Sequence, residues 1–220
     1  MLWHEEQDAE TFVVPEAVID LAFQVRCPTL PVDHAWALSE AIRARLPWFS
    51  DDSGAGLHLI HGAESGNGWE RPSEGEALIY LSRRTPLTLR LPAAWVEAAA
   101  RLSGEALEIG SHRMEVGPSK QRRLDRTNTL YARYVASPLQ DPSEEAFLAW
   151  AIGELRGLGL SFKKVLCGRQ QGLRSPAGEI LTRSLMVADL PFADAIRLQE
   201  SGLGPHRTRG CGLFIPHKPV

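Results

Sequence analysis

The sequence predicts an α+β protein with a tandem ferredoxin-like fold, in which two βαββαβ domains follow one another. The length of 220 residues suits two domains of about 100 residues each. A hydrophobic content of 44% is sufficient for a packed core. One order of elements, namely strand, helix, two strands, helix and strand, occurs twice along the chain. This order places two helices on one face of an antiparallel sheet.

The first copy is expected over residues 18–118, after an acidic N-terminal extension over residues 1–17. Asp33 is a suitable N-cap for a first helix that Pro47 ends, and Pro92 stands where a second helix can begin. Apolar or alternating segments give the strands, which we place at 18–26, 57–61, 77–81, 86–91, 107–109 and 114–116. Together these elements make one βαββαβ unit.

The second copy is expected over residues 129–220, and a polar, basic stretch over residues 119–128 is predicted to link the two domains. Ser143 is an N-cap followed by two glutamates, which favour the first turn of a helix. A shorter helix is expected over residues 191–199. The strands are placed at 129–136, 164–167, 180–188 and 211–215.

Composition and charge exclude several classes of protein. Cys27, Cys167 and Cys211 lie far apart and form no C-x-x-C pair, so we expect no disulfide framework and no zinc site. We also expect no other metal and no cofactor. No apolar run approaches the roughly 18 residues that a membrane span needs, and the acidic N-terminus has no signal-peptide pattern. We therefore expect a cytoplasmic protein without a membrane partner. The net charge of -3 does not indicate a nucleic-acid partner, although basic residues cluster late in the chain.

The segment over residues 202–214 is the most informative part of the sequence. Its four glycines, Gly202, Gly204, Gly210 and Gly212, lie between a predicted helix and a predicted strand. Glycines allow backbone N–H groups to approach a phosphate, and Arg207 and Arg209 add positive charge at the same place. A helix C-cap followed by a bulged strand would explain the same glycines without a ligand.

This end of the chain resembles the glycine-rich motif of the RAMP superfamily, through residues 199–204 (QESGLG) and residues 210–216 (GCGLFIP). More narrowly, it is similar to the sixth numbered Cas family, in its MYXAN-type variant. Residues 32–38 (VDHAWAL) resemble the start of that variant's first helix, and Gly168-Arg169 before a hairpin fits its second domain. The resemblance covers most of the chain from about residue 18 onward.

The resemblance implies an endoribonuclease that cuts CRISPR repeat RNA into guide RNAs. Members of the family usually act without a metal and leave a 2′,3′-cyclic phosphate and a 5′-hydroxyl. Many stay on the repeat stem-loop as a subunit of an effector complex, so the expected partners are the repeat RNA and other Cas subunits: backbone, scaffold and large subunits.

RNA carries its own nucleophile, the 2′-hydroxyl, and cutting needs a group that takes its proton. A histidine with a pKa near the ordinary value of about 6.5 suits this task. His34 is the candidate, because it begins the first predicted helix and the resemblance places the family's catalytic histidine there. The alternative is an exposed histidine that helps to start a helix. His58 is the reserve catalytic candidate.

The residues expected to contact RNA are basic side chains and the glycine-rich loop. Double-stranded RNA is recognised mostly by shape and phosphate contacts, and an arginine at a hairpin tip can read a base edge. Each basic residue could instead be a solvated surface charge. The set is Lys120, Arg122, Arg123, Lys163, Lys164, Arg169, Arg174, Gly202, Gly204, His206, Arg207, Arg209, Gly210 and Gly212.

Two other functions stay open. The first is a RAMP subunit that holds the end of a guide RNA without cutting it, which a His34→Ala variant distinguishes from an endoribonuclease. The second is a ferredoxin-like small-molecule enzyme or regulatory domain. A basic RNA groove predicts an affinity for repeat RNA that falls steeply with salt, and the absence of binding would favour this second alternative.

Overall fold

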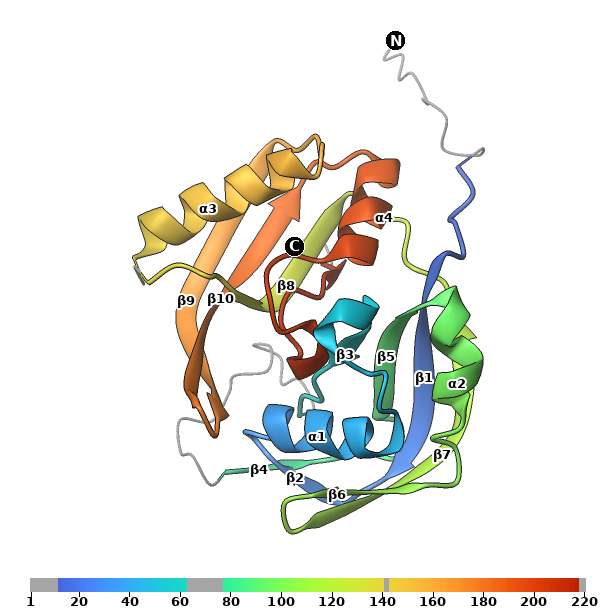
Figure 1. Ribbon diagram of the computed structural model, residues 1–220. Helices are drawn as coiled ribbons and strands as arrows, with labels where there is room; N and C mark the ends of the chain where they lie inside the picture. Colours follow the sequence, from blue (N-terminus) through green and yellow to red (C-terminus); the bar gives the residue numbers. More distant parts are fainter. Residues whose placement is uncertain (1–11, 63–76, 141–142, 218–220) are drawn as a thin grey trace.

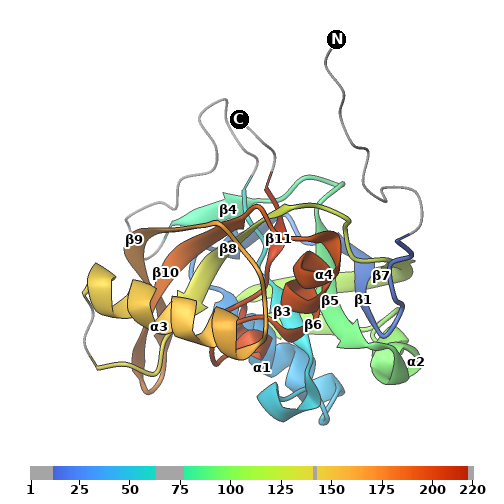
Figure 2. The ribbon, with the colours of Figure 1, turned by 90° about the horizontal axis from the view of Figure 1, so that it is seen from above.

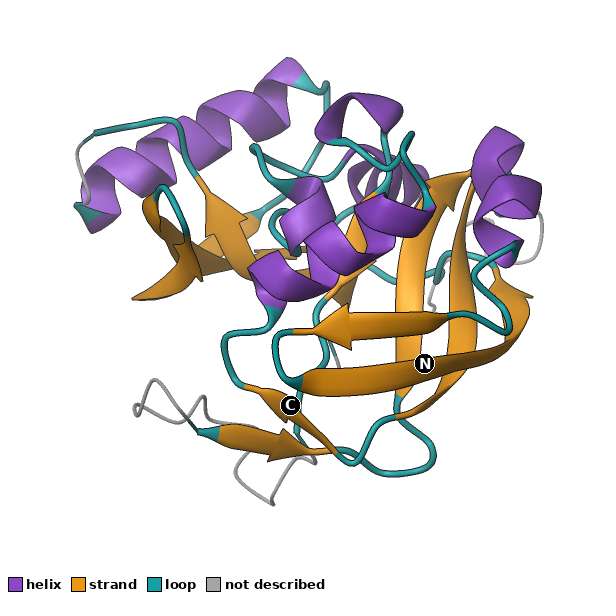
Figure 3. Ribbon diagram, turned by 60° about the horizontal axis from the view of Figure 1, so that its bottom comes forward, coloured by secondary structure: helices purple, strands orange, loops and turns teal. Residues whose placement is uncertain are grey.

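The computed structural model describes residues 12–62, 77–140 and 143–217, so most of the predicted acidic extension lies outside the described residues (Figure 1). The two halves of the chain each form an antiparallel sheet. The helices of both domains gather on one side of the molecule and the strands on the other (Figures 2 and 3). The prediction of a tandem α+β architecture is confirmed.

The first domain contains a five-stranded antiparallel sheet with the order β3-β5-β1-β7-β6. Its strands are β1 (Val18–Arg26), β3 (Gly56–His58), β5 (Pro86–Pro92), β6 (Ala106–Ile109) and β7 (His112–Arg122). Its helices are α1 (Ala35–Arg45), the 3₁₀ helices η1 (Asp51–Ser53) and η2 (Ala93–Trp95), and α2 (Val96–Ala100). The part β3-β5-β1-β7 has the ferredoxin-like order, and β6 extends it as a hairpin with β7.

The core of this domain follows from the alternation in β1. Leu21, Phe23 and Val25 occupy alternate positions and are buried in one cluster with Leu38 and Ile42 of α1. Side chains four residues apart lie on one face of a helix, so Leu38 and Ile42 both pack against the same face of the sheet. Full burial of each large apolar side chain contributes about 1.5–3 kcal/mol relative to exposure.

Strand β7 is longer than the sequence predicts. It runs to Arg122 as a partner of β1, with Lys120 opposite Ala22 and Arg122 opposite Asp20. The predicted linker over residues 119–128 is therefore shortened to residues 123–128. The sequence does not reveal this extension because backbone pairing, rather than a stripe of buried side chains, forms the end of the strand.

The strand predicted over residues 77–81 is present but belongs to a different sheet. β4 (Leu78–Tyr80) pairs with β2 (Thr29–Pro31) in a separate two-stranded sheet. The alternating pattern identifies the strand and carries no information about its partner.

The second domain repeats the topology with a four-stranded sheet in the order β11-β8-β10-β9. Its strands are β8 (Thr129–Ala136), β9 (Lys164–Ser175), β10 (Gly178–Ala188) and β11 (Ile215–Pro216), and its helices are α3 (Glu144–Gly157) and α4 (Phe192–Ser201). Ser143 caps α3 as predicted, because its hydroxyl oxygen accepts a hydrogen bond from the Ala146 N–H at 3.2 Å.

The β9–β10 hairpin is longer than predicted, and the last strand is shorter. The extra part of the hairpin lacks a long apolar pattern, but its Leu173 packs, together with Ile180 of the predicted strand, against the first domain in a cluster that contains Ala35. Tertiary contact therefore stabilises it. Residues 211–214, predicted to begin the last strand, fold into the glycine-rich loop instead.

Contact between the domains also explains a difference at the start of α1. The Asp33 carboxylate accepts a hydrogen bond from the Arg174 backbone N–H at 3.2 Å, and it lies 3.4 Å from the Arg174 Nε. Asp33 therefore joins the hairpin to the first domain, and His34 occupies the N-cap position that Asp33 was expected to take.

Candidate functional site

The glycine-rich segment folds into a tight loop between α4 and β11, with the 3₁₀ helix η3 (Arg207–Arg209) in its middle. Leu203 N–H donates to the Gly212 carbonyl at 3.1 Å, and Gly212 N–H donates to the Tyr134 carbonyl at 2.7 Å. All four of its glycines have positive φ, between 65° and 87°. A Cβ at Gly204 would collide with the Ala136 carbonyl. The positive φ angles and the close packing of the loop therefore explain its glycines without a ligand.

We expect Gly212→Ala to destabilise the protein more than Gly104→Ala does. Both glycines have positive φ, 68° and 92°, so each substitution carries a similar backbone strain of about 1–2 kcal/mol. Nothing lies within 4 Å of a Cβ at Gly104, whereas a Cβ at Gly212 would collide with the Leu203 carbonyl. The loop must then shift, at a further cost of about 1–3 kcal/mol. Urea unfolding of both variants measures the difference, and equal losses would show that the loop has spare room.

Most of the backbone amides of the loop are used within the protein. The N–H groups of residues 202, 203 and 209–212 donate to backbone carbonyls, and Thr208 N–H donates to the Asp51 carboxylate at 3.0 Å. These amides are not available to a phosphate in this conformation, which differs from the prediction. Gly202 and Gly212 are buried, and Gly204 and Gly210 are half-buried. The loop thus supports side chains and is not a cradle of free amides.

Arg207 has a structural role that the sequence did not indicate. Its side chain is only 8% exposed, and its guanidinium donates to the carbonyls of Ser201, Glu200 (3.0 Å) and Gly54 (3.4 Å). Burial lowers the pKa of Arg207 to about 10, with a further lowering from nearby Arg90. Because Gly54 belongs to the first domain, Arg207 joins the loop to that domain. The sequence had instead predicted that Arg207 contacts RNA.

Arg209 and His206 are polar side chains of the loop that remain partly exposed. The Arg209 guanidinium lies 4.2 Å from the centre of the Trp36 ring on α1, in a cation–π contact. Its Nη1 is 3.3 Å from His206 Nδ1. Since an arginine can only donate, Nδ1 accepts and Nε2 carries the proton of the neutral ring.

His206 also has an unusual backbone and a shifted pKa. Its φ of 67° lies in the left-handed region, which costs free energy for a residue other than glycine. Burial lowers the pKa of His206, and Arg209 acts in the same direction, while Asp51 opposes them. The imidazole is therefore neutral near pH 7 and offers an N–H donor.

His34 lies beneath the loop with both ring nitrogens hydrogen-bonded. Its Nδ1 is 2.9 Å from the Pro31 carbonyl, and its Nε2 accepts from the Ile60 N–H at 3.2 Å. The ring is 2% exposed, so it is not the exposed helix-starting histidine that was the alternative. A carbonyl on Nδ1 fixes the tautomer in which Nε2 carries the lone pair, and a general base needs that lone pair.

Two contacts place His34 next to the loop. The neighbouring Ala35 packs in one buried cluster with Cys211 of the loop. Leu59, which precedes the partner Ile60, fills the space beside Gly210, where a Cβ would collide with it. The glycine-rich loop and the base candidate thus share one packed unit, although they are separated by about 170 residues in the sequence.

His58, the reserve candidate, belongs to a different cluster. Its Nε2 lies 3.3 Å from the Asp20 carboxylate, which also forms two hydrogen bonds with Arg90, at 2.8 and 2.9 Å. Arg90 is 1% exposed and donates to the carbonyls of Gln199 (3.2 Å) and Phe214 (2.7 Å) in the second domain. Burial lowers the pKa of His58. His58 therefore belongs to the hydrogen-bonded cluster through which Arg90 joins the two domains.

This cluster predicts a pH dependence of stability. Burial alone would raise the pKa of Asp20, but the hydrogen bonds from Arg90 and His58 outweigh it and hold the pKa well below its ordinary value. The carboxylate therefore contributes stability above about pH 4, and this contribution is lost as the pH falls below that value. We expect the difference in unfolding free energy between wild type and Asp20→Asn to shrink from pH 6 to pH 3. A constant difference would contradict the assignment.

The other predicted RNA contacts form two groups on opposite sides of the molecule, because β7 and β9 lie at opposite edges (Figures 1 and 2). One group lies on β7 and just after it: Lys120, Arg122 and Arg123. The other lies on β9 and just before it: Lys163, Lys164, Arg169 and Arg174. Arg123 pairs with Glu16, and Arg174 with Asp33. Only the far end of β9 reaches the surroundings of the loop, where Leu173 packs in one cluster with Cys211 and Arg174 pairs with Asp33.

Several site residues were missed by the sequence reasoning. Trp36, Asp51 and Arg90 support the loop, but each binds a partner more than 65 residues away in the chain. Of these three residues, only Trp36 lies in a motif that the sequence analysis singled out, the one over residues 32–38. Among the residues that the structure describes, no three His, Cys, Asp or Glu side chains lie close enough to hold a metal ion. None of the described helices is long and apolar enough to cross a membrane.

Comparison with known proteins gives consistent results. The family model "Cas6 Crispr" matches residues 19–219. The CRISPR-associated endonuclease Cas6 of Myxococcus xanthus (strain DK1622) is 31% identical over 198 residues, which cover 90% of this chain and 81% of the relative.

Solved structures show the same fold at low sequence identity. A structure described as CRISPR associated protein Cas6 superposes with a TM-score of 0.65 at 12% identity, covering 91% of this chain and all of the other. A Cas6-related protein from Pyrococcus furiosus gives 0.60 at 13% identity, covering 90% and 97%. A RAMP protein described as binding different RNA substrates gives 0.61 at 14% identity, covering 89% and 98%. With its tandem ferredoxin-like fold, the chain belongs to the Cas6 family of CRISPR-associated proteins.

Proposed function

We propose that this protein is an endoribonuclease that cuts the repeat RNA of CRISPR precursor transcripts into guide RNAs. The family and a relative named as an endonuclease support this function. The observation that carries the proposal is the position of His34, held in the tautomer of a general base beneath the loop that presents Arg209 and His206.

The chemistry uses the 2′-hydroxyl of the RNA as the nucleophile. His34 Nε2 takes its proton, the oxygen attacks the adjacent phosphorus, and the bond from phosphorus to the 5′-oxygen breaks as that oxygen gains a proton. The products are a 2′,3′-cyclic phosphate and a 5′-hydroxyl, with no metal required. Arg209 lies at the loop surface, where its charge stabilises the phosphate as negative charge develops.

For this reaction the hydrogen bond from the Ile60 N–H to His34 Nε2 has to open. At 3.2 Å this bond is long, and it is replaced by the bond to the substrate hydroxyl. Catalytic hydrogen bonds in free enzymes commonly tighten or rearrange only when the substrate is bound. The bond from Nδ1 to the Pro31 carbonyl keeps the ring in the correct tautomer throughout.

Binding uses the β9 side of the molecule. Lys163, Lys164 and Arg169 are exposed there and contact phosphates of the repeat stem. The product stem-loop then stays bound, and the protein serves as a subunit of an effector complex with the backbone, scaffold and large Cas subunits.

The experiment is incubation of the purified protein with its repeat RNA, in EDTA and in magnesium, over a range of salt concentrations. We expect one specific cut at equal rates in EDTA and magnesium, with an affinity that falls steeply as salt rises. Binding without any cut would favour the alternative of a non-cutting RAMP subunit. A cut that needs magnesium would contradict the proposed mechanism.

A further inference from the structure

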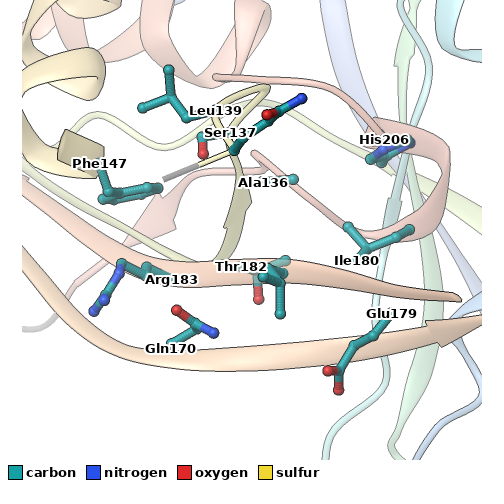
Figure 4. Close-up of a pocket in the computed structure, with 12 residues that line it drawn as sticks. Ala136, Ser137, Leu139, Phe147, Gln170, Glu179, Ile180, Thr182, Arg183 and His206 are labelled. Carbon is teal, nitrogen blue, oxygen red and sulfur yellow. The ribbon is translucent and has the colours of Figure 1, made fainter. Parts of the chain in front are cut away.

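A cavity of about 310 Å³ lies beside the loop and is used by none of the steps above (Figure 4). Its floor is the β9–β10 hairpin, with Gln170, Glu179 and Thr182 among the lining residues. The turn after β8 and the first part of α3 form its wall, and His206 of the glycine-rich loop stands at one end (Figure 4). The cavity is thus continuous with the surface that carries Arg209.

The wall and the loop pack directly against each other. Gly204 of the loop packs so closely on the Ala136 carbonyl that no side chain fits between them. Ala136 and the following Ser137 line the cavity. When a phosphate of the RNA lies at the loop, the adjacent nucleotide can therefore reach the cavity.

The chemistry of the cavity suits a nucleobase and not a phosphate. Glu179 is the carboxylate among the lining residues, and Glu144 at the start of α3 lies beside the lining residue Arg183. Arg183 is already engaged, because it donates to the Gly168 carbonyl at 3.1 Å and lies 3.9 Å from Glu144. A phosphate would be repelled here, whereas a neutral group with N–H donors would be attracted.

The walls supply apolar surface for a flat ring. Phe147 lines the cavity, together with Leu139 and Leu181, which are 40% and 46% exposed although they are large and apolar. The polar groups at the floor include an amide at Gln170 and a carboxylate at Glu179, and such groups pair with the hydrogen-bonding edges of bases. Unpaired bases of RNA are commonly held in this way, by apolar or aromatic walls and by contacts to an edge.

Gly172 of β9 makes room for the carboxylate. The Glu179 side chain folds back across the hairpin, and a Cβ at Gly172 would collide with it. The hairpin thus holds Glu179 at the cavity floor, although the residue itself lies close to the exposed tip.

We propose that this cavity binds one unpaired nucleobase of the repeat RNA, next to the cut, and that Gln170 and Glu179 read its hydrogen-bonding edge. The inference rests on the proposed function, because it assumes that repeat RNA is the ligand. It assigns the cavity a part in selecting the sequence at the cut, separate from the phosphate contacts of the loop and β9.

The test is a set of repeat RNAs in which each unpaired nucleotide in turn lacks its base. Wild type is expected to lose affinity by about tenfold or more at one position, the size of effect found for a single stacked base. The double variant Gln170→Ala/Glu179→Ala is expected to bind the intact RNA more weakly and to lose most of its sensitivity at that position. The matched control Gln24→Ala/Glu97→Ala changes the same residue types at exposed sites on β1 and α2 and is expected to behave as wild type.

Two results would overturn the inference, and they differ in what else they affect. If wild type binds and cuts the intact RNA but tolerates every missing base, or if the double variant keeps the full sensitivity, the cavity holds no base and the proposed function stands. If wild type does not bind repeat RNA at low salt, both the cavity inference and the proposed function fail.

Discussion

The His34→Gln variant is expected to bind repeat RNA with an affinity close to that of wild type and to cut it about 10²–10⁴-fold more slowly, the contribution typical of a general base. Glutamine can accept the hydrogen bond from the Ile60 N–H, which His34 Nε2 accepts in the wild type. It therefore preserves the packing beneath the loop better than alanine, but its amide has no basic nitrogen to take a proton.

Two controls accompany this variant. His112→Gln removes a histidine of β7 that contacts the Thr29 hydroxyl at 3.2 Å, outside the site, and its cutting rate should match that of wild type. Thermal unfolding shows whether His34→Gln is folded under the assay conditions. A folded His34→Gln variant that cuts as fast as wild type would show that His34 is a core histidine and that another group takes the proton.

The Arg90→Met variant should lose about 3–5 kcal/mol of unfolding free energy, because removal of one partner leaves the other charge of a buried ion pair without compensation. Arg90 forms both hydrogen bonds with the Asp20 carboxylate and also donates to the Gln199 and Phe214 carbonyls. The substitution thus removes two hydrogen bonds within the first domain and two between the domains. Cutting should fall as well, since Phe214 ends the glycine-rich loop.

Arg113→Met is the matched control, because Arg113 pairs with Glu108 at 3.1 Å while both side chains are more than 60% exposed. Such exposed pairs contribute at most about 1 kcal/mol. Urea unfolding of the two variants measures the contrast. If Arg90→Met were as stable as Arg113→Met, the buried network would not hold the domains together.

The sequence was sufficient for the order of elements and much less so for the contacts between distant segments. Strands β1 and β8 were predicted at the residues observed, and Ser143 was identified as a cap, because apolar alternation and capping are local signals. The far part of β7 and the part of β9 beyond residue 167 have no such pattern. Backbone pairing and packing against the other domain form them.

The same distinction applies to the site. The glycine-rich segment was located from its composition, but the use of its glycines could not be read from the sequence. Arg207 and Arg209 are two residues apart and equivalent in type, yet one is buried among carbonyls and the other lies on Trp36. Arg207 also reaches Gly54 and Arg209 reaches Trp36, both in the first domain and more than 150 residues away, so only the folded chain distinguishes the two arginines.

The most direct measurement is the chemical identity of the RNA ends that the purified protein leaves on its repeat RNA in EDTA. Attack by the 2′-hydroxyl predicts a 2′,3′-cyclic phosphate on the upstream fragment and a 5′-hydroxyl on the downstream one, absent when the 2′-hydroxyl at the cut is replaced by hydrogen. A 5′-phosphate on the downstream fragment, or cutting of the 2′-deoxy substrate, would show that water and not the RNA's own hydroxyl is the nucleophile.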